Sequence, residues 1–371
     1  MTGASGIPAV PVGVVVGRLP DGRQIRAHTL SSAGGPTLTV LDLGATVRAL
    51  HAFEPGPDGR RRNVVLGHRH AVDHYLAEPQ PYFGAVVGRY ANRIARSRFL
   101  LDGATHEVTS NEGPTCLHGG PDGFHRQLWS VTDRTRSTIT LQLTSPHLDQ
   151  GFPGELVAVV HYAVTEAGVR IEITARTSEP TVVNLTNHAY FNLHGEDSGT
   201  ICDHLLTVDA DSFLPVDEDK IPLGYAAPVH GTALDFTAPT LVADALASGD
   251  PHVARFGGID HSFPLRGEGM RRAARLVEPA SGRVLEIFTD QPALQVYTGD
   301  ALDGSVRGTS GRPYPRGAGI ALETQRHPDA PNQPLSPAVL RPGETYRSST
   351  EWRLLTDEPS SRPRAWPWAA P

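Results

Sequence analysis

Short segments in which apolar and polar residues alternate recur along most of this chain, and turns rich in glycine and proline separate them. Two of the clearest are 138–143 and 169–177. A period of two is typical of strands that bury one face of a sheet. The 38 glycines and 32 prolines supply turns for many such strands, and a helical period is convincing only at 241–247. The pattern predicts an all-β fold, an antiparallel sandwich or barrel.

The turn signals also predict where individual strands lie. The loop 166–168 is short enough to close a β-hairpin between 156–165 and 169–177. Further strands are expected at 13–16, 24–30, 38–43, 46–50, 285–288 and 293–297.

No linker, low-complexity segment or internal repeat divides the sequence. Because a sandwich can run to about two hundred residues or more as one domain, we expect a single β-sandwich domain over residues 1–358. The last residues, 359–371, contain several prolines and two tryptophans, and we expect them to form an irregular extension.

Charge and cysteine content limit the classes of partner and compartment. A formal net charge of −7 without a long basic run gives no sign of binding to nucleic acid or to an anionic membrane. No segment reaches the roughly 18 apolar residues of a membrane span, and the first residues do not resemble a signal peptide. Cys116 and Cys202 match no metal or redox motif, which fits a reducing compartment. We expect a cytoplasmic protein that is a monomer or a homodimer.

Motifs for cofactors and metals are missing from the sequence. It contains no glycine-rich phosphate loop, no His-Glu-x-x-His sequence and no Gly-x-Ser-x-Gly elbow. The 17 histidines are scattered and form no recognisable set of metal ligands. We therefore expect no cofactor and no metal, with chemistry performed by side chains alone.

One polar stretch, 184–195, carries the strongest sign of chemistry. It places His188 among amides, hydroxyls and aromatic rings, directly after the strand-like run 180–183. The unperturbed pKa of histidine, about 6.5, lets it give or take a proton near neutral pH. Tyr190 offers a flat face that suits the C–H face of a sugar as well as a hydrophobic core. Taken alone, the stretch is also consistent with a buried strand whose polar groups are satisfied.

Three further segments bring polar side chains next to turn residues: Asn92 and Arg93 in 88–95, His118 in 111–120, and Glu323 in 321–332. An arginine in such a place commonly forms a surface ion pair, and a single glutamate is usually solvated. The same groups can instead hold hydroxyls and remove a proton.

These four segments, in this order and spacing, resemble the aldose 1-epimerase family, the galactose mutarotases. The resemblance extends from the N-terminal strands to about Arg353, and it implies a large antiparallel β-sandwich. Its most specific motifs are Leu117-His-Gly-Gly120, Asn184-Leu-Thr-Asn-His-Ala-Tyr-Phe-Asn-Leu193, and Glu323-Thr-Gln with Pro328-Asp-Ala-Pro-Asn332. Two weaker motifs are Gly258-Ile-Asp-His-Ser-Phe263 and Gln295-Val-Tyr-Thr-Gly299.

The resemblance also implies a role for each matching residue and a small sugar as the substrate. Glu323 stands at the position of the general base, which removes the proton from the anomeric hydroxyl. His188 stands at the position of the general acid, which protonates the ring oxygen as the C1–O5 bond breaks. The positions that match groups holding the sugar are Asn92, Arg93, His118, Tyr190, Asp260 and Gln295.

The chemistry explains these residue types without the resemblance. Ring opening requires one oxygen to lose a proton while its neighbour gains one, so an acid and a base must face one edge of the sugar. For Glu323 to act as a base near pH 7, its pKa should be raised by burial or by the like charge of Asp260. Arg93 would lower that pKa, and the sequence leaves the balance open.

Two positions depart from the family pattern. His327 stands where an aromatic ring such as Phe or Tyr is expected, and Asp300 stands where asparagine is more usual. Both positions can border the site, so they bear on the identity of the sugar rather than on the reaction. The stretch 305–317, rich in glycine, proline and arginine, is interpreted as a mobile surface loop, with a reshaped pocket rim as the alternative.

The leading hypothesis is an aldose 1-epimerase that interconverts the α and β anomers of galactose, glucose or a related free hexose. A relative acting on a hexose phosphate, or on a hemiacetal in a specialised pathway, is a second hypothesis. A phosphate would require arginines at the rim, and Arg307, Arg312 and Arg316 are the clustered candidates. A carbohydrate-binding module would not need an acid–base pair. A glycosidase could use Glu323 and Asp260, which leaves the histidine motif unexplained.

Overall fold

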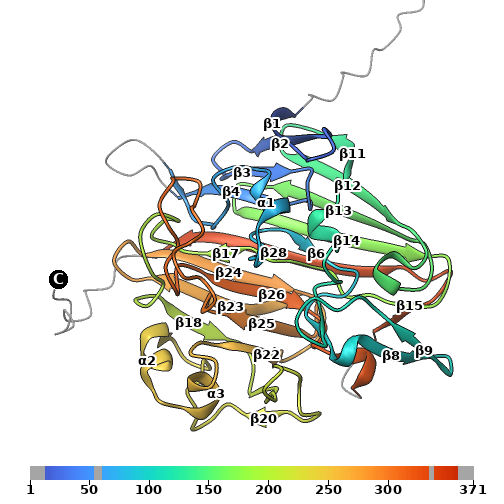
Figure 1. The fold of residues 1–371 in the computed structure, drawn as a ribbon. Helices are drawn as coiled ribbons and strands as arrows, with labels where there is room; N and C mark the ends of the chain where they lie inside the picture. Colours follow the sequence, from blue (N-terminus) through green and yellow to red (C-terminus); the bar gives the residue numbers. More distant parts are fainter. Residues whose placement is uncertain (1–12, 54–60, 334–337, 358–371) are drawn as a thin grey trace, which may run out of the picture.

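The computed structural model describes residues 13–53, 61–333 and 338–357, and antiparallel strands make up most of its regular secondary structure (Figure 1). The expected extension 359–371 lies outside the described residues. The largest sheet has nine strands, which in spatial order are β11 (Ser130–Arg134), β12 (Thr138–Ser145), β13 (Leu156–Val164), β14 (Gly168–Thr177), β28 (Tyr346–Thr356), β24 (Arg283–Thr289), β23 (Arg271–Glu278), β18 (Leu205–Val208) and β21 (Thr240–Leu241).

Two smaller sheets accompany the large one. The five-stranded sheet consists, in order, of β1 (Val14–Arg18), β2 (Gln24–Ser31), β3 (Thr37–Leu41), β4 (Val47–Ala52) and β5 (Arg62–Asn63). The four-stranded sheet consists of β17 (Tyr190–Phe191), β26 (Ile320–Gln325), β25 (Ala293–Tyr297) and β22 (Asp260–Pro264).

Short two-stranded ladders and a few helical turns complete the described structure. The ladders are β7 (Arg93–Ile94) with β10 (Cys116–Leu117), β6 (Val86–Val87) with β16 (Thr186–Asn187), β15 (Thr181–Val182) with β27 (Val339–Leu340), β19 (Ser212–Phe213) with β20 (Ala227–Pro228), and β8 (Arg98–Leu101) with β9 (Ala104–Glu107). The helices are α1 (Asp73–Leu76), α2 (Val242–Ala247) and α3 (Pro251–Ala254), with 3₁₀ turns at Ala95–Ser97, Phe124–Arg126, Asp149–Gly151 and Ala330–Asn332. Within the described ranges, no helix is both long and apolar enough to cross a membrane.

One hydrophobic core joins the three larger sheets. Ile139 and Val160 from the nine-stranded sheet, Leu38 from the five-stranded sheet and Leu322 from the four-stranded sheet belong to the same buried cluster. Sheets that share a core in this way form a sandwich. The predicted all-β sandwich is therefore confirmed.

The alternating segments behave as the sequence predicts. Along β13, fully buried residues alternate with half-buried ones, and Val164 pairs with Val169 across the expected hairpin to β14. The one expected helix is α2. Strand β26 is different, because every residue from Ile320 to Gln325 is buried. This strand carries Glu323, so the glutamate that would ordinarily be solvated lies inside the protein.

Candidate active site

The four-stranded sheet brings together residues that lie far apart in the sequence. On β26 and β25, Glu323 stands directly opposite Gln295, and on β22 Asp260 stands opposite Tyr297 of β25. Residues opposite each other on antiparallel strands have Cβ atoms about 5 Å apart. The Nε2 atom of Gln295 donates a hydrogen bond to Oδ1 of Asp260 over 2.7 Å. Strand pairing thus places two carboxylates and an amide in one group.

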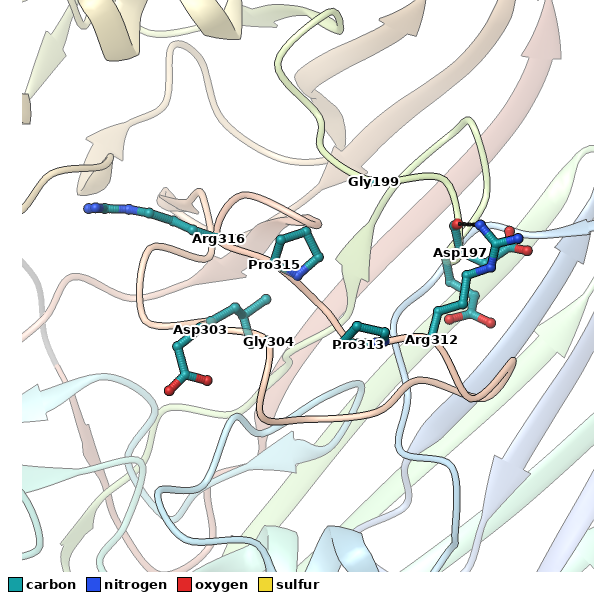
Figure 2. A pocket seen from close by; sticks show the side chains of 10 residues that line it. Asp197, Gly199, Asp303, Gly304, Arg312, Pro313, Pro315 and Arg316 are labelled. Atoms are coloured by element: carbon teal, nitrogen blue, oxygen red, sulfur yellow. Dashed lines mark hydrogen bonds between the residues drawn. The ribbon is translucent and has the colours of Figure 1, made fainter. Parts of the chain in front are cut away.

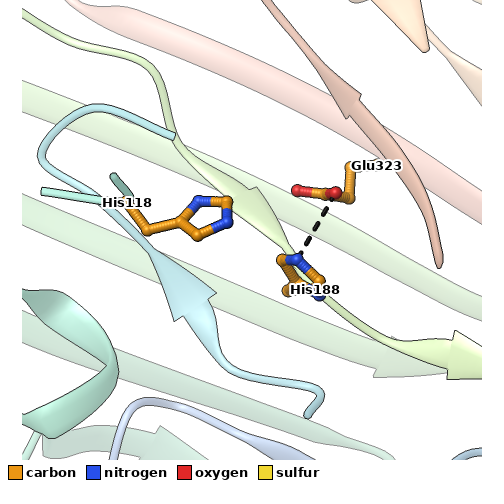
Figure 3. Close-up of side chains that lie close together, drawn as sticks. All are labelled: His118, His188 and Glu323. Carbon is orange, nitrogen blue, oxygen red and sulfur yellow. Dashed lines mark ion pairs between the residues drawn. The ribbon is translucent and has the colours of Figure 1, made fainter. Parts of the chain in front are cut away.

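The expected acid and base face each other beside this sheet. His188 follows β16, and its backbone is fixed because its N–H donates to the Ala85 carbonyl and its carbonyl accepts from Gly84, both over 2.9 Å. Its Nε2 atom lies 3.4 Å from Oε1 of Glu323 (Figure 3). Both side chains are buried. The two groups are close enough to act on neighbouring oxygen atoms of one small molecule.

Burial controls the proton affinity of both groups. It raises the pKa of Glu323 well above its ordinary value, and the like charge of Asp260 adds to this, whereas the charge of Arg93 lowers the pKa without prevailing. Burial also lowers the pKa of His188 to about 4. Because desolvation opposes charge on each member, one proton shared by the pair satisfies both shifts. The balance that the sequence left open is therefore decided by burial.

His118 is oriented by a backbone hydrogen bond. The N–H of Asn92 donates to Nδ1 of His118 over 3.0 Å, so in the neutral ring Nε2 carries the hydrogen. Burial holds the pKa of His118 well below its ordinary value, which keeps the ring neutral. The ring centroid lies 5.0 Å from that of His188 (Figure 3). His118 is thus a hydrogen-bond donor next to the acid–base pair.

Close backbone packing at Gly119 supports this arrangement. Gly119 has a φ of +85°, and a Cβ atom added there would lie 2.0 Å from the Gly88 carbonyl oxygen. Only glycine allows the two backbones to approach in this way. Gly119 thus permits the close backbone approach beside His118.

Charged groups near the His188–Glu323 pair hold one another in place. Arg93 binds both oxygens of Glu112, with Nε at 2.6 Å and Nη2 at 2.8 Å, and its Nη1 lies 3.8 Å from Oδ2 of Asp260. Burial alone would raise the pKa of Asp260, but the charges of Lys220 and Arg93 and hydrogen bonds from Lys220 and Gln295 lower it. Asp260 is therefore a buried anion with several donors around it.

One nitrogen or oxygen atom from each of His118, His188 and Glu323 lies within 4.8 Å of the others, so the three could in principle hold a metal ion. A histidine that ligates a metal usually donates its other ring N–H to an acceptor. His118 has the opposite polarity, because its Nδ1 accepts from the Asn92 backbone and its Nε2 bears the hydrogen. This set of donors fits hydrogen bonding to a sugar oxygen better than it fits a metal ion.

A pocket of about 990 Å³ opens over these residues. The expected site residues that line it are Asn92, Arg93, His118, His188, Tyr190, Asp260 and Glu323. Gln295 contacts Asp260 but is not among the lining residues, and its Oε1 atom is buried without a hydrogen-bond partner among the described residues.

Two lining residues that contact the expected site residues, Tyr82 and Lys220, were not singled out from the sequence. The ring of Tyr82 packs against His118 and His125, with centroid distances of 4.6 and 4.7 Å. No local pattern marks Tyr82, since the loop that carries it is positioned by tertiary packing. Lys220 donates from Nζ to Oδ2 of Asp260 over 2.8 Å. The sequence does contain one signal for Lys220, because it is the only lysine of the chain.

The stretch 305–317 is tied into the protein rather than projecting from it. Tyr314 is buried, and its hydroxyl donates to Oε2 of Glu196 over 2.5 Å. Ser305, Val306 and Arg307 of this stretch line the site pocket. The structure therefore fits a pocket rim better than the mobile loop that the sequence favoured. The contact with Glu196 could not be predicted, because Glu196 lies far from this stretch in the sequence.

A second pocket, of about 480 Å³, is lined in part by the same stretch (Figure 2). Arg312 and Arg316 line it, and they point in different directions: Arg312 donates to the Asp197 carbonyl over 3.2 Å, and Arg316 to the Gly257 carbonyl over 2.5 Å. Arg307 lines the first pocket instead. The three arginines considered for a phosphate therefore do not converge on one point.

The two departures from the family pattern do not line the site pocket. His327 is buried, with Nδ1 3.3 Å from the Ser262 hydroxyl, and burial lowers its pKa to about 4. Burial also raises the pKa of Asp300, while the charge of Lys220 lowers it. Asp300 thus acts on the site through charge, and His327 belongs to the supporting structure.

Comparisons with known proteins agree with this geometry. The sequence model of the aldose 1-epimerase family matches residues 26–353. The chain is 45% identical over 318 residues to a galactose mutarotase of Bos taurus, which covers 85% of this chain and 90% of that protein. It is 40% identical over 346 residues to an aldose 1-epimerase of Escherichia coli K12, which covers 91% of this chain and 97% of that protein.

Solved structures show the same fold. The crystal structure of an aldose epimerase homologue from C. elegans superimposes with a TM-score of 0.83 at 28% identity, covering 90% of this chain and all of that one. A galactose 1-epimerase from Lactobacillus acidophilus superimposes with a TM-score of 0.82 at 26% identity, covering 94% of this chain and all of that one. With the family match spanning most of its length, this chain belongs to the aldose 1-epimerase family.

Proposed function

We propose that this chain is an aldose 1-epimerase that interconverts the α and β anomers of a free hexose, with Glu323 as the general base and His188 as the general acid. The observation that carries the proposal is the buried pair itself, with His188 Nε2 and Glu323 Oε1 3.4 Å apart in a pocket lined by hydrogen-bonding groups. A positioned acid or base typically accelerates such a step by about 10²–10⁴-fold.

In the proposed reaction, Glu323 takes the proton of the anomeric hydroxyl while His188 delivers a proton to the ring oxygen. The C1–O5 bond breaks, and the open-chain aldehyde rotates about its C1–C2 bond. Closure on the other face of the carbonyl then returns both protons, with the acid and the base exchanging roles. The pair holds one transferable proton before and after the reaction. The pKa shifts place that proton on Glu323 in the free protein, so it must move to His188 before Glu323 can act as the base.

The surrounding groups would hold the sugar during this exchange. The Nε2–H of His118 and the guanidinium of Arg93 are donors, and Asp260 is an acceptor. Each of the two donors is fixed by a second contact: His118 by the Asn92 backbone, and Arg93 by Glu112. Such support matters because small displacements of a positioned group reduce its catalytic effect.

The charge around the pair favours a neutral sugar. Beside the pair, the cations Arg93 and Lys220 already contact carboxylates, those of Glu112 and Asp260 respectively. A phosphate placed there would have to compete with these carboxylates for both cations. Because several similar proteins are named galactose mutarotase, galactose is the first sugar to test.

The test is polarimetry of freshly dissolved α-D-galactose and α-D-glucose at pH 7, with and without the protein. The proposal predicts faster decay to the same equilibrium rotation. If neither sugar responds, galactose 6-phosphate and calorimetric binding of the free sugars would separate a phosphate-specific enzyme from a carbohydrate-binding module.

A glycosidase-like displacement at C1 can be distinguished with galactose carrying ¹⁸O in the anomeric hydroxyl. Ring opening breaks C1–O5, so during the first turnovers the label stays on C1. Displacement by water would remove the label at the rate of anomer exchange, and that result would contradict the proposed mechanism.

We also propose a cytoplasmic location. Cys116 and Cys202 are both free thiols. Disulfides form mainly in oxidising compartments, so two unpaired cysteines fit a reducing one. Cell fractionation with detection of the full-length chain would test the location.

A further inference from the structure

Lys220 is the only lysine among the 33 lysine and arginine residues of the chain. Every other permanently cationic side chain is an arginine, including those in surface ion pairs such as Arg341 with Asp102. The single lysine nevertheless lies in the site pocket. A chain that uses arginine everywhere else thus places its one lysine among the groups that surround the acid–base pair.

A tight turn directs this lysine into the pocket. Oδ1 of Asp217 accepts hydrogen bonds from the backbone N–H groups of Asp219 and Ile221, each over 2.9 Å, and the Lys220 N–H donates to the Asp217 carbonyl. Lys220 itself has a φ of +59°. This left-handed conformation is unfavourable for a residue other than glycine. Strained residues held by their surroundings are frequent at functional sites.

The ammonium group is held from three sides. It donates to Oδ2 of Asp260 over 2.8 Å and lies 5.2 Å and 5.9 Å from the ring centroids of Phe256 and Tyr297. The side chain is 23% exposed, toward the pocket that it lines. An ammonium has three N–H donors, and Asp260 is its one hydrogen-bond acceptor among the described residues. Donors are therefore left for a molecule in the pocket.

The physical difference between lysine and arginine explains why a lysine suits this place. An ammonium is a compact charge with freely rotating donors, whereas a guanidinium is a larger planar fork. Between two aromatic rings and a carboxylate, the compact group can turn its free N–H bonds toward hydroxyls at varied angles.

We propose that Lys220 is a substrate-binding and positioning residue of this site: its ammonium holds Asp260 in place and donates hydrogen bonds to hydroxyl groups of the bound sugar. The inference rests on the proposed function, since it assigns a contact to the same sugar. It also links Lys220 to the reaction, because the charge of Asp260 raises the pKa of Glu323 and Lys220 forms an ion pair with Asp260.

The single lysine allows a direct test of the contact. The full chain is prepared with lysine labelled with ¹³C at Cε and methionine labelled at its methyl carbon, so that Lys220 gives one side-chain signal. Galactose is then added up to saturation, as measured by calorimetry. We expect the Lys220 signal to shift along the binding curve. Met270, which is 49% exposed and does not line the pocket, is the internal control and should not shift. An unchanged Lys220 signal at saturation would overturn the inference even if the protein is an active mutarotase.

Kinetics test the positioning role. In Lys220→Met, loss of a charged hydrogen-bond donor should raise KM by about tenfold to a hundredfold, with a smaller change in kcat. Lys220→Arg keeps the charge and should recover part of the loss. Glu218→Gln, an exposed residue of the same turn, is the control and should leave KM unchanged. A folded Lys220→Met variant with the KM of the wild type would contradict the proposal. If that variant does not fold, Lys220→Arg and the labelling experiment decide.

Discussion

Gly119 shows how a single residue determines the shape of the site. Gly119 directly follows His118 in the sequence. A Cβ atom added to Gly119 would lie 2.0 Å from the Gly88 carbonyl oxygen. Gly103 provides a matched comparison, because its φ of +82° is almost the same but nothing lies within 4 Å of an added Cβ. The two glycines therefore separate the effect of backbone conformation from the effect of close approach.

Gly103→Ala should lower the free energy of unfolding by about 1–2 kcal/mol, the cost of a left-handed conformation. Gly119→Ala should cost several kcal/mol more and also reduce activity, because the backbone beside His118 must move. Urea unfolding of both variants, with polarimetry of the folded protein, measures this. Equal stabilities for the two variants would show that the close approach at Gly119 is unimportant.

Most of the candidate site could be predicted at the scale of residues. His188, His118, Asp260 and Glu323 lie in short motifs whose composition and order suggested the family, and the structure brings them together. Their protonation could not be predicted, because the pKa of Glu323 depends on burial that only the folded chain defines. Lys220 and Tyr82 could not be assigned for a similar reason, since tertiary packing brings their loops to the pocket.

At the scale of elements, Arg89 joins two segments that the sequence does not relate. Arg89 is 2% exposed, and its guanidinium binds the end of β12 and the loop between β12 and β13. It also lies just before Asn92 and Arg93, so it fixes the segment that carries them. Its acceptors are the hydroxyl and carbonyl oxygens of Ser145 and the carbonyls of Pro146, Phe152, Pro153 and Gly154.

Arg89→Met should lower the free energy of unfolding by at least about 3 kcal/mol, because several buried carbonyls lose their donor at about 1–3 kcal/mol each. The same change should weaken sugar binding through Asn92 and Arg93. Arg170→Met, at an exposed position of β14, should change stability by no more than about 0.5 kcal/mol. Chemical denaturation of the two variants gives both values, and a similar small loss for each would argue against the role of Arg89.

Alternation of apolar and polar residues predicted the strands that bury one face. It could not predict a strand that is buried on both faces or one that is only two residues long. The alternation along β12 and β13 could be read directly because one face packs on the core. Strand β26 is buried throughout, so it shows no alternation. Two-residue strands such as β7 and β16 are too short to show a period, yet they hold Arg93 and fix the segment just before His188.

At the scale of the whole molecule, the described chain has one dominant core. Its largest hydrophobic cluster contains residues from Leu30 to Trp352 and includes side chains of all three larger sheets. We propose that the domain predicted over 1–358 folds as a single unit. Denaturation followed by fluorescence and by circular dichroism should then give coincident transitions.

Buried histidines make the whole fold sensitive to acid. Burial lowers the pKa of five of them to about 4: His28, His68, His188, His261 and His327. In the unfolded chain each would titrate near 6.5. Below that pH the unfolded state binds more protons than the folded state, so stability is lost as the pH falls from about 6.5 towards 4.

Each such histidine lowers the free energy of unfolding by about 1.4 kcal/mol for each pH unit of acidification within that window. The urea midpoint should therefore be constant near pH 7 to 8 and fall steeply between pH 6.5 and 5. His194 acts in the opposite direction, because a hydrogen bond to Asp203 raises its pKa, and so do the buried acids Asp42 and Glu323, whose pKa values burial raises. The histidines with a lowered pKa outnumber these groups. A midpoint that does not change from pH 7.5 to pH 5 would show that these histidines are not buried in the neutral form.

The most direct test of the central claim is the mutarotation rate of α-D-galactose at pH 7 for the wild type, Glu323→Gln and His188→Asn. Glu172→Gln, at an exposed position of β14, serves as the control. Circular dichroism and calorimetric sugar binding would establish that each variant is folded. We predict that each of the two site variants loses about 10²–10⁴-fold in kcat, while the control keeps the wild-type rate. A folded Glu323→Gln variant that still accelerates mutarotation like the wild type would contradict the assignment of Glu323 as the base.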